Sequence, residues 1–193
     1  MIKQLRAAST LAVALLSLSG AAHADGRCTN ETLRGAFGFI GHGTILGLIA
    51  DDGTVHTISP PSLLDDVALI TFDGIGHFTR TDFGMIAGLP KGGKTTFNPA
   101  QSGTYSVNSD CTGTMKIVYE AGGAMPAGVE TDLNMVIAAD GTLIESVVYR
   151  AVTAGGKSGD NMVMCPPNCL QGMQESFEGK KVSVFRSGND RWR

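Results

Sequence analysis

The side chains best suited to acid–base chemistry in this 193-residue sequence are three histidines and the carboxylates near them. The histidines are His42, His56 and His77, and the carboxylates are Asp65, Asp66, Asp73 and Asp82. If the fold brought such groups together, they could donate and accept protons or hold a metal ion. Their spacing does not require this, and a polar residue directly after a turn, such as His77, usually faces solvent. We therefore expect no metal and no cofactor.

Charged residues inside predicted strands are the second set of candidates. There are three of them, Arg80, Glu145 and Arg150. Each of these side chains either faces solvent in a cross-strand pair or points inward. A buried Arg/Glu pair could hold a carboxylate ligand. The catalytic candidates are accordingly His77, Arg80 and Glu145, because the sequence contains neither a Gly-x-Ser-x-Gly elbow nor a phosphate-binding loop followed by a helix.

A set of apolar residues is expected to point into the fold. They are Phe37, Phe39, Phe72, Phe78, Phe83, Tyr105, Met135 and Tyr149. Such residues either fill the core or line an apolar cavity for one small ligand. All of them except Phe83 are our candidates for ligand-lining residues.

Two segments centred on turns, 67–83 and 102–119, indicate which secondary-structure elements hold these residues in place. In both, strand-forming residues flank a short cluster of Gly, Asp, Asn and Ser, which is typical of a tight hairpin. No stretch shows sustained helical periodicity, and no βαβ alternation occurs, so a parallel sheet is not expected. The sequence predicts an all-β protein, an antiparallel up-and-down barrel of about eight strands, with a two-sheet β-sandwich as the alternative.

The individual elements can be placed along the chain. The expected strands are 36–49, 55–59, 67–72, 77–85, 103–107, 113–120, 131–138, 142–152 and 181–186. We expect helical turns at 30–34 and 62–66, with Pro60 and Pro61 ending the second strand.

The first 24 residues have the features of a secretory signal peptide. Lys3 and Arg6 precede an apolar run over 11–18, and Ala22 and Ala24 occupy the cleavage positions. We expect export to the periplasm or the medium, and a single barrel domain over 25–193 with no transmembrane segment. Cleavage changes the formal charge from −3 to −3 − 2 = −5. A mildly acidic chain without a basic stripe is not expected to bind nucleic acid.

Four cysteines in an exported chain predict disulfide bonds, although four cysteines allow three pairings. Two prolines between Cys165 and Cys169 bring those thiols near each other, which would leave Cys28 to pair with Cys111. The expected result is a disulfide-bearing loop near 153–173. A redox-active Cys165/Cys169 pair is the alternative, and its three-residue spacing argues against it.

Four segments in the same order resemble a group of small secreted bacterial proteins of unassigned function. They are Leu-Arg-Gly-Ala-Phe-Gly-Phe at 33–39, Leu-Ile-Thr-Phe-Asp-Gly-Ile-Gly-His-Phe at 69–78, Ser-Gly-Thr-Tyr-Ser-Val-Asn-Ser-Asp-Cys-Thr-Gly-Thr at 102–114 and Met-Val-Ile-Ala-Ala-Asp-Gly-Thr at 135–142. The resemblance implies a small barrel like those of allene oxide cyclases, dirigent proteins and lipocalins (calycin-like). It also implies that the cysteine of the Asp-Cys-Thr-Gly turn is bridged to one near the N-terminus.

These features together favour an exported binding or interaction protein that holds a small apolar ligand in its barrel. The alternative is a cofactor-independent barrel isomerase or cyclase, in which a shaped cavity aligns the substrate. The sequence does not indicate an oligomeric state.

Overall fold

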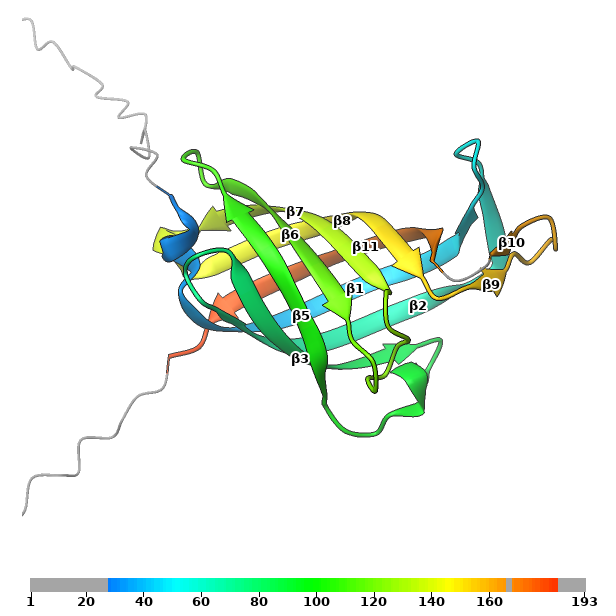
Figure 1. The fold of residues 1–193 in the computed structure, drawn as a ribbon, viewed down its shortest axis with the longest axis horizontal. Coiled ribbons are helices and arrows are strands. Elements are labelled where there is room, and N and C mark those ends of the chain that lie inside the picture. Colours follow the sequence, from blue (N-terminus) through cyan, green and yellow to red (C-terminus); the bar gives the residue numbers. More distant parts are fainter. Residues whose placement is uncertain (1–27, 166–167, 184–193) are drawn as a thin grey trace, which may run out of the picture.

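Eight strands pair in the order β2-β1-β11-β8-β7-β6-β5-β3, and the pairing of β2 with β3 closes them into an antiparallel barrel (Figure 1). This computed structural model describes residues 28–165 and 168–183, so the predicted signal peptide over 1–24 lies outside the described residues. The barrel strands are β1 (Gly35–Ile49), β2 (Val55–Phe72), β3 (His77–Ile86), β5 (Asn98–Val107), β6 (Thr112–Tyr119), β7 (Glu130–Ala138), β8 (Leu143–Thr153) and β11 (Cys169–Lys181). The predicted barrel is confirmed.

Six short elements complete the structure. They are β4 (Leu89–Pro90), β9 (Gly156–Lys157), β10 (Met164–Cys165), and the 3₁₀ turns η1 (Asn30–Leu33), η2 (Lys91–Gly93) and η3 (Ala139–Gly141). Strand β4 extends the sheet beside β3, whereas β9 and β10 pair only with each other. Both described ends of the chain lie at the η1 end of the barrel, and β9 and β10 lie at the opposite end (Figure 1).

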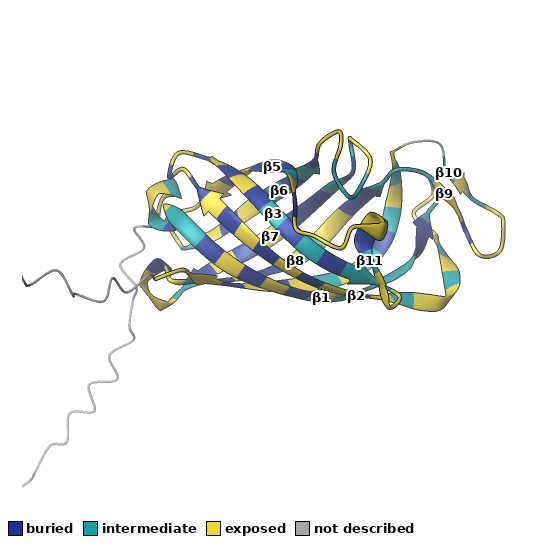
Figure 2. Cartoon of the chain, turned by 90° about the horizontal axis from the view of Figure 1, so that it is seen from below, coloured by how far each residue is buried: buried dark blue, intermediate teal, exposed yellow. Residues whose placement is uncertain are grey.

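Alternation of buried and exposed residues shows how the strand sequences specify the barrel (Figure 2). In β2, every second residue from Leu64 to Phe72 is buried, and the residues between them are exposed. Because neighbouring side chains of a strand point to opposite faces, this pattern places one set inside and the other in solvent.

Strand β2 differs from the sequence prediction in one place. Pro60 and Pro61 do not end it, and 62–66 is strand rather than a helical turn. The ladder between β1 and β2 shifts from the pair Ile45/Ser62 to the pair Gly47/Thr57. The prolines therefore lie where the ladder is interrupted and need not donate hydrogen bonds to it, so the strand continues on both sides of them.

The last strand also lies elsewhere than predicted. Strand β11 covers Cys169–Lys181, so it ends where the predicted strand 181–186 begins. Its inward residues include Glu175 and Gly179, which interrupt the apolar alternation that a sequence pattern detects. At Gly179, a Cβ atom would lie within 2.4 Å of the Phe39 ring, so glycine makes room for that aromatic side chain.

One half of the barrel is filled by the predicted apolar residues. Phe37, Phe39, Phe72, Phe78, Tyr105 and Met135 are all buried in one core with Leu33 of η1. The Phe72 ring lies 5.5 Å from that of Phe37 and 5.0 Å from that of Tyr105, in edge-on contacts. A void of only about 10 Å³ lies next to Phe39 in this half.

Two residues predicted to point inward do not. Tyr149 is 59% exposed on the outer face of β8, so its assignment as a ligand-lining residue was wrong. Phe83 lies between the buried residues Asp82 and Gly84, and its ring contacts that of Phe97 outside the barrel. In β3 the period of two is kept, and Asp82 and Gly84 take the inward positions. In β8 the alternation breaks at Tyr149 and Arg150, which are both exposed, where the ladder with β7 shifts.

Both predicted disulfide bonds are present. Cys28 is bonded to Cys111, 83 residues away, and Cys165 is bonded to Cys169. The first bond ties the start of the described chain to the turn between β5 and β6, next to η1. Within the described part of the chain, no helix is both long enough and apolar enough to cross a membrane.

Candidate functional site

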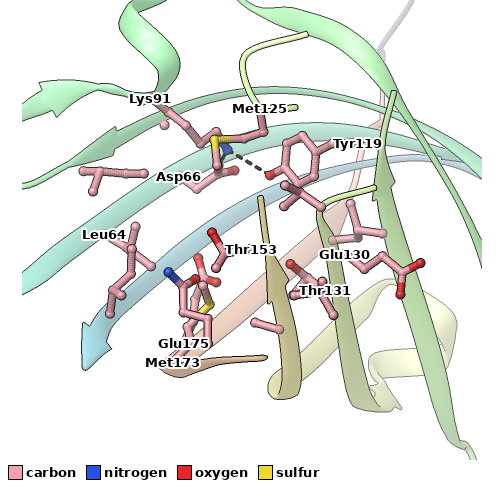
Figure 3. A pocket seen from close by; sticks show the side chains of 18 of the residues that line it. Leu64, Asp66, Lys91, Tyr119, Met125, Glu130, Thr131, Thr153, Met173 and Glu175 are labelled. Atoms are coloured by element: carbon pink, nitrogen blue, oxygen red, sulfur yellow. Dashed lines mark hydrogen bonds and ion pairs between the residues drawn. The ribbon is translucent and has the colours of Figure 1, made fainter. Parts of the chain in front are cut away.

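The other half of the barrel encloses a cavity of about 80 Å³ (Figure 3). Its wall is mixed in character. The apolar lining residues include Ile45, Leu64, Ile86, Ile117, Met125, Val129, Val152 and Met173, and the polar ones include Asp66, Arg80, Lys91, Tyr119, Thr131, Thr153 and Glu175. Lys91 comes from η2 and Met125 from the loop between β6 and β7, so both loops cover the cavity.

Arg80 is the centre of a buried charged network. Its side chain is 2% exposed, and it donates hydrogen bonds to Asp66 at 2.6 Å and to Asp82 at 2.5 Å. It also donates to the Gln101 side-chain oxygen. Gln101 in turn donates to the second oxygen of Asp82 at 2.6 Å, which fixes that carboxylate on both sides.

Lys91 is the second cation of the network. Its ammonium group donates to Asp66 at 2.7 Å, to Asp82, and to the Tyr119 hydroxyl at 3.1 Å. These three contacts use all three of its donors. Lys91 lies in a 3₁₀ turn rather than in a barrel strand, so the network ties η2 to the barrel wall.

The network balances two cations against two carboxylates, which is why it can be buried. Burial alone would raise the pKa of Asp82, but the charges of Arg80 and Lys91 outweigh it and hold that pKa at about 2. Burial raises the pKa of Asp66, and the same two cations oppose the rise. The pKa of Arg80 is raised by the Asp66 and Asp82 charges against the cost of burial, so the guanidinium stays charged.

Glu175 is the carboxyl group of the cavity that has no cationic partner among the described residues, whereas Asp65 contacts His42 and Glu130 contacts Lys116 and Arg150. It faces inward from β11 and forms neither a hydrogen bond nor an ion pair with any residue of 28–165 or 168–183. Burial, together with the nearby Asp66 charge, raises its pKa from 4.5 to about 7. Glu175 can therefore accept or donate a proton near neutral pH.

Irregular strand pairing makes room for this site. The ladder between β11 and β8 shifts between Gln171 and Ser176, on either side of Glu175. On its other side, Glu175 pairs with Gly43 of β1, which has no side chain to fill the space. A further shift between β3 and β5 lies at Arg80 and Asp82. Such bulges commonly redirect side chains next to functional sites.

Of the three predicted catalytic candidates, only Arg80 reaches this cavity. His77 and Glu145 are exposed on the outer face, so the possible buried pair of Arg80 with Glu145 does not form. Arg80 binds Asp66 and Asp82 in place of Glu145.

The histidines do not come together. His42 contacts Asp65 at 2.7 Å on the surface, His56 contacts Asp160 at 2.8 Å near the far hairpin, and His77 lies 3.4 Å from Asp73. These are three separate pairs on the outside of the barrel. Among the residues that the structure describes, no three His, Cys, Asp or Glu side chains are grouped so that they could hold a metal ion.

Sequence reasoning missed several polar residues of the site, namely Lys91, Gln101, Tyr119, Thr131, Thr153 and Glu175. It considered Asp66 and Asp82 only as partners for histidine. A signal for the strand members was present, since Asp66 shares the buried face of β2 with Ile70, and Arg80 shares that of β3 with Phe78. A charged residue on the apolar face of a strand indicates a buried network.

The comparisons with known proteins add no assignment: no family model, no curated protein and no solved structure matches this chain.

Proposed function

We propose that this protein is an exported barrel that binds one small molecule in the cavity beside Glu175. The observation that carries the proposal is the contrast between the two halves of the barrel. Six predicted aromatic and apolar residues fill one half, whereas the other half keeps a cavity of about 80 Å³ with charged side chains in its wall.

The composition of the cavity wall supports a ligand rather than a packing defect. Ligand sites are mostly apolar, with a few converging polar groups that orient the bound molecule. Here Leu64, Met125 and Met173 supply apolar surface, and Tyr119 and Glu175 supply polar groups. A dry cavity of about 150 Å³ admits benzene, so this one suits a smaller molecule. Export is supported by the two disulfide bonds, which persist in oxidising compartments.

Filling the cavity tests this function. Thr153 points into the cavity from β8, so Thr153→Phe is expected to occupy the space of the ligand (Figure 3). Native mass spectrometry after mild purification, with apolar extracts offered, should show a bound small molecule on the unsubstituted protein and none on this variant. Val147→Phe is the matched control, because Val147 is 55% exposed on the outer face of the same strand.

The control variant should retain the molecule as the unsubstituted protein does, and thermal unfolding should show that both variants are folded. If the unsubstituted protein retains nothing from any extract, the binding function is excluded and a structural role remains.

A second candidate function is a cofactor-independent isomerase or cyclase. The observation that favours it is the pKa of Glu175, about 7, in a largely apolar cavity. A carboxyl group with such a pKa can remove a proton from a substrate carbon and return it elsewhere at neutral pH. The Tyr119 hydroxyl lines the same cavity, and it could stabilise a developing oxyanion by exchanging its long hydrogen bond to Asp82, at 3.4 Å, for one to the substrate.

Hydrogen exchange distinguishes this candidate from simple binding. Carbonyl compounds that bind should exchange the hydrogen next to the carbonyl with deuterium from heavy water, as followed by NMR. Replacing Glu175 with Gln should reduce this exchange by a factor of about 100 or more, because Gln cannot accept the proton. Exchange that continues unchanged in the variant would exclude Glu175 as the proton acceptor.

A further inference from the structure

We infer that the molecule held in this cavity is a small primary amine with an apolar body, whose ammonium group pairs with Glu175. The inference rests on the proposed binding function and specifies its ligand class. It follows from which polar groups of the cavity are already engaged and which one is not.

The cations of the cavity are not free to bind an anionic ligand. All three donors of Lys91 are used, by Asp66 at 2.7 Å, by Asp82, and by Tyr119 at 3.1 Å. Both terminal nitrogens of Arg80 are also engaged, one with Asp66 and the other with Asp82 and the Gln101 oxygen. An incoming carboxylate or phosphate would have to displace these buried partners, which is costly.

Glu175 is the carboxyl group that lacks a partner. The network of Arg80, Lys91, Asp66 and Asp82 carries no net charge, so ionised Glu175 leaves one uncompensated negative charge in the cavity wall. A buried charge is stabilised by an opposite charge and by hydrogen-bond donors. An ammonium group supplies both, since it is a cation with three donors. The Thr131 and Thr153 hydroxyls line the same cavity and can accept its remaining hydrogen bonds.

The apolar part of the cavity wall determines which hydrocarbon group the ligand can carry. Ile45, Leu64, Met125, Val129 and Met173 present only apolar atoms to the cavity. A short branched or cyclic hydrocarbon group would bury its surface against them. Methionine side chains adapt to irregular shapes, so the site can accept more than one such group.

The charged surroundings of Glu175 determine how binding depends on pH. Facing the cavity are Asp66 of β2, Arg80 of β3, Lys91 of η2, Tyr119 of β6 and Glu130 of β7, with Asp82 of β3 behind them in the network. Asp65 of β2 also borders the cavity, but its side chain is exposed and contacts His42. Strands β1 and β8 add no titratable group to the lining. An amine is protonated throughout the neutral range and requires ionised Glu175, so its affinity rises with pH. A neutral ligand that accepts a hydrogen bond requires protonated Glu175, so its affinity falls with pH.

Calorimetric titration with three probes of one carbon skeleton tests the inference. The probes are propylamine, propan-1-ol and propanoate, which are all smaller than benzene, each titrated into the full disulfide-bonded protein at about pH 6 and about pH 8. Propylamine should bind most tightly, and its Kd should fall about tenfold between the two pH values, as a single group of pKa near 7 requires. Glu175→Gln should weaken amine binding at least about tenfold at the higher pH and remove the pH dependence.

The control variant is Glu178→Gln, which changes an exposed carboxylate on the outer face of the same strand and should leave all three titrations unchanged. Binding of propan-1-ol or propanoate at least as tight as that of the amine would overturn the inference and leave the binding function standing. Affinity for the amine that is retained in Glu175→Gln would also overturn it. Failure of all three probes to bind would count against the binding function itself.

Discussion

Replacing Arg80 with methionine is expected to lower the free energy of unfolding by about 3–5 kcal/mol, because it removes one partner from a buried ion network. Methionine keeps most of the side-chain length but leaves Asp66 and Asp82 with Lys91 as their shared cation. Chemical denaturation followed by circular dichroism measures the change. The loss is large in relation to the stability of an ordinary domain, about 5–15 kcal/mol.

Arg34→Met is the matched control. Arg34 also forms an ion pair, with Glu31 at 2.7 Å, but the two side chains are 67% and 60% exposed. An exposed pair of this kind is screened by solvent, so its loss should destabilise the protein far less than the loss of Arg80. Equal losses in the two variants would show that the interior network does not contribute as a buried unit.

Removing the long-range disulfide bond is expected to have a comparable effect. Replacing both Cys28 and Cys111 with serine opens a loop of 83 residues, and the chain-entropy model gives a loss of about 4 kcal/mol. The bond also secures η1, where Asn30 accepts hydrogen bonds from the Val107 amide at 2.8 Å and the Tyr105 hydroxyl at 3.1 Å. Thermal and chemical unfolding of the double variant give the measurement.

The second disulfide bond provides the comparison, since Cys165 and Cys169 are only four positions apart. The same model gives about 2 kcal/mol for so short a loop, and we expect the effect to be confined to the segment around β9 and β10. A larger loss from this local bond than from the long-range one would contradict the entropic account.

Strand alternation and turn signals were sufficient to predict the barrel. The period of two in 67–72 and 77–85 correctly placed Phe72 and Phe78 on the inner face, where Arg80, whose direction the sequence left open, also lies. The prediction failed where a single local signal, the proline pair, was taken to end a strand. Proline ends a strand only where its missing N–H is needed, and Pro60 and Pro61 lie at an interruption of the ladder.

The candidate site was less accessible to sequence reasoning, because its members meet through tertiary structure. Lys91 reaches Asp66 and Asp82 from a 3₁₀ turn that follows β4, and nothing in its sequence context predicts where that turn folds. Glu175 interrupts the apolar alternation of β11. The sequence pattern therefore predicted neither this strand nor the inward position of Glu175. A charged residue at an inward position is predictable in principle only once the strand register is known.

The short turn η1 has a kinetic consequence. Leu33 of this turn is completely buried in the apolar core, and the nearby Cys28 is bonded to Cys111. The η1 turn therefore closes this end of the barrel, and the disulfide bond holds the turn in place. A bound molecule would then have to enter and leave away from that end, and Met125 and Lys91 belong to the loops that cover the cavity (Figure 3). Its residence time would then be governed by the opening of these two covering loops, which can change without any change in the strands that select the ligand.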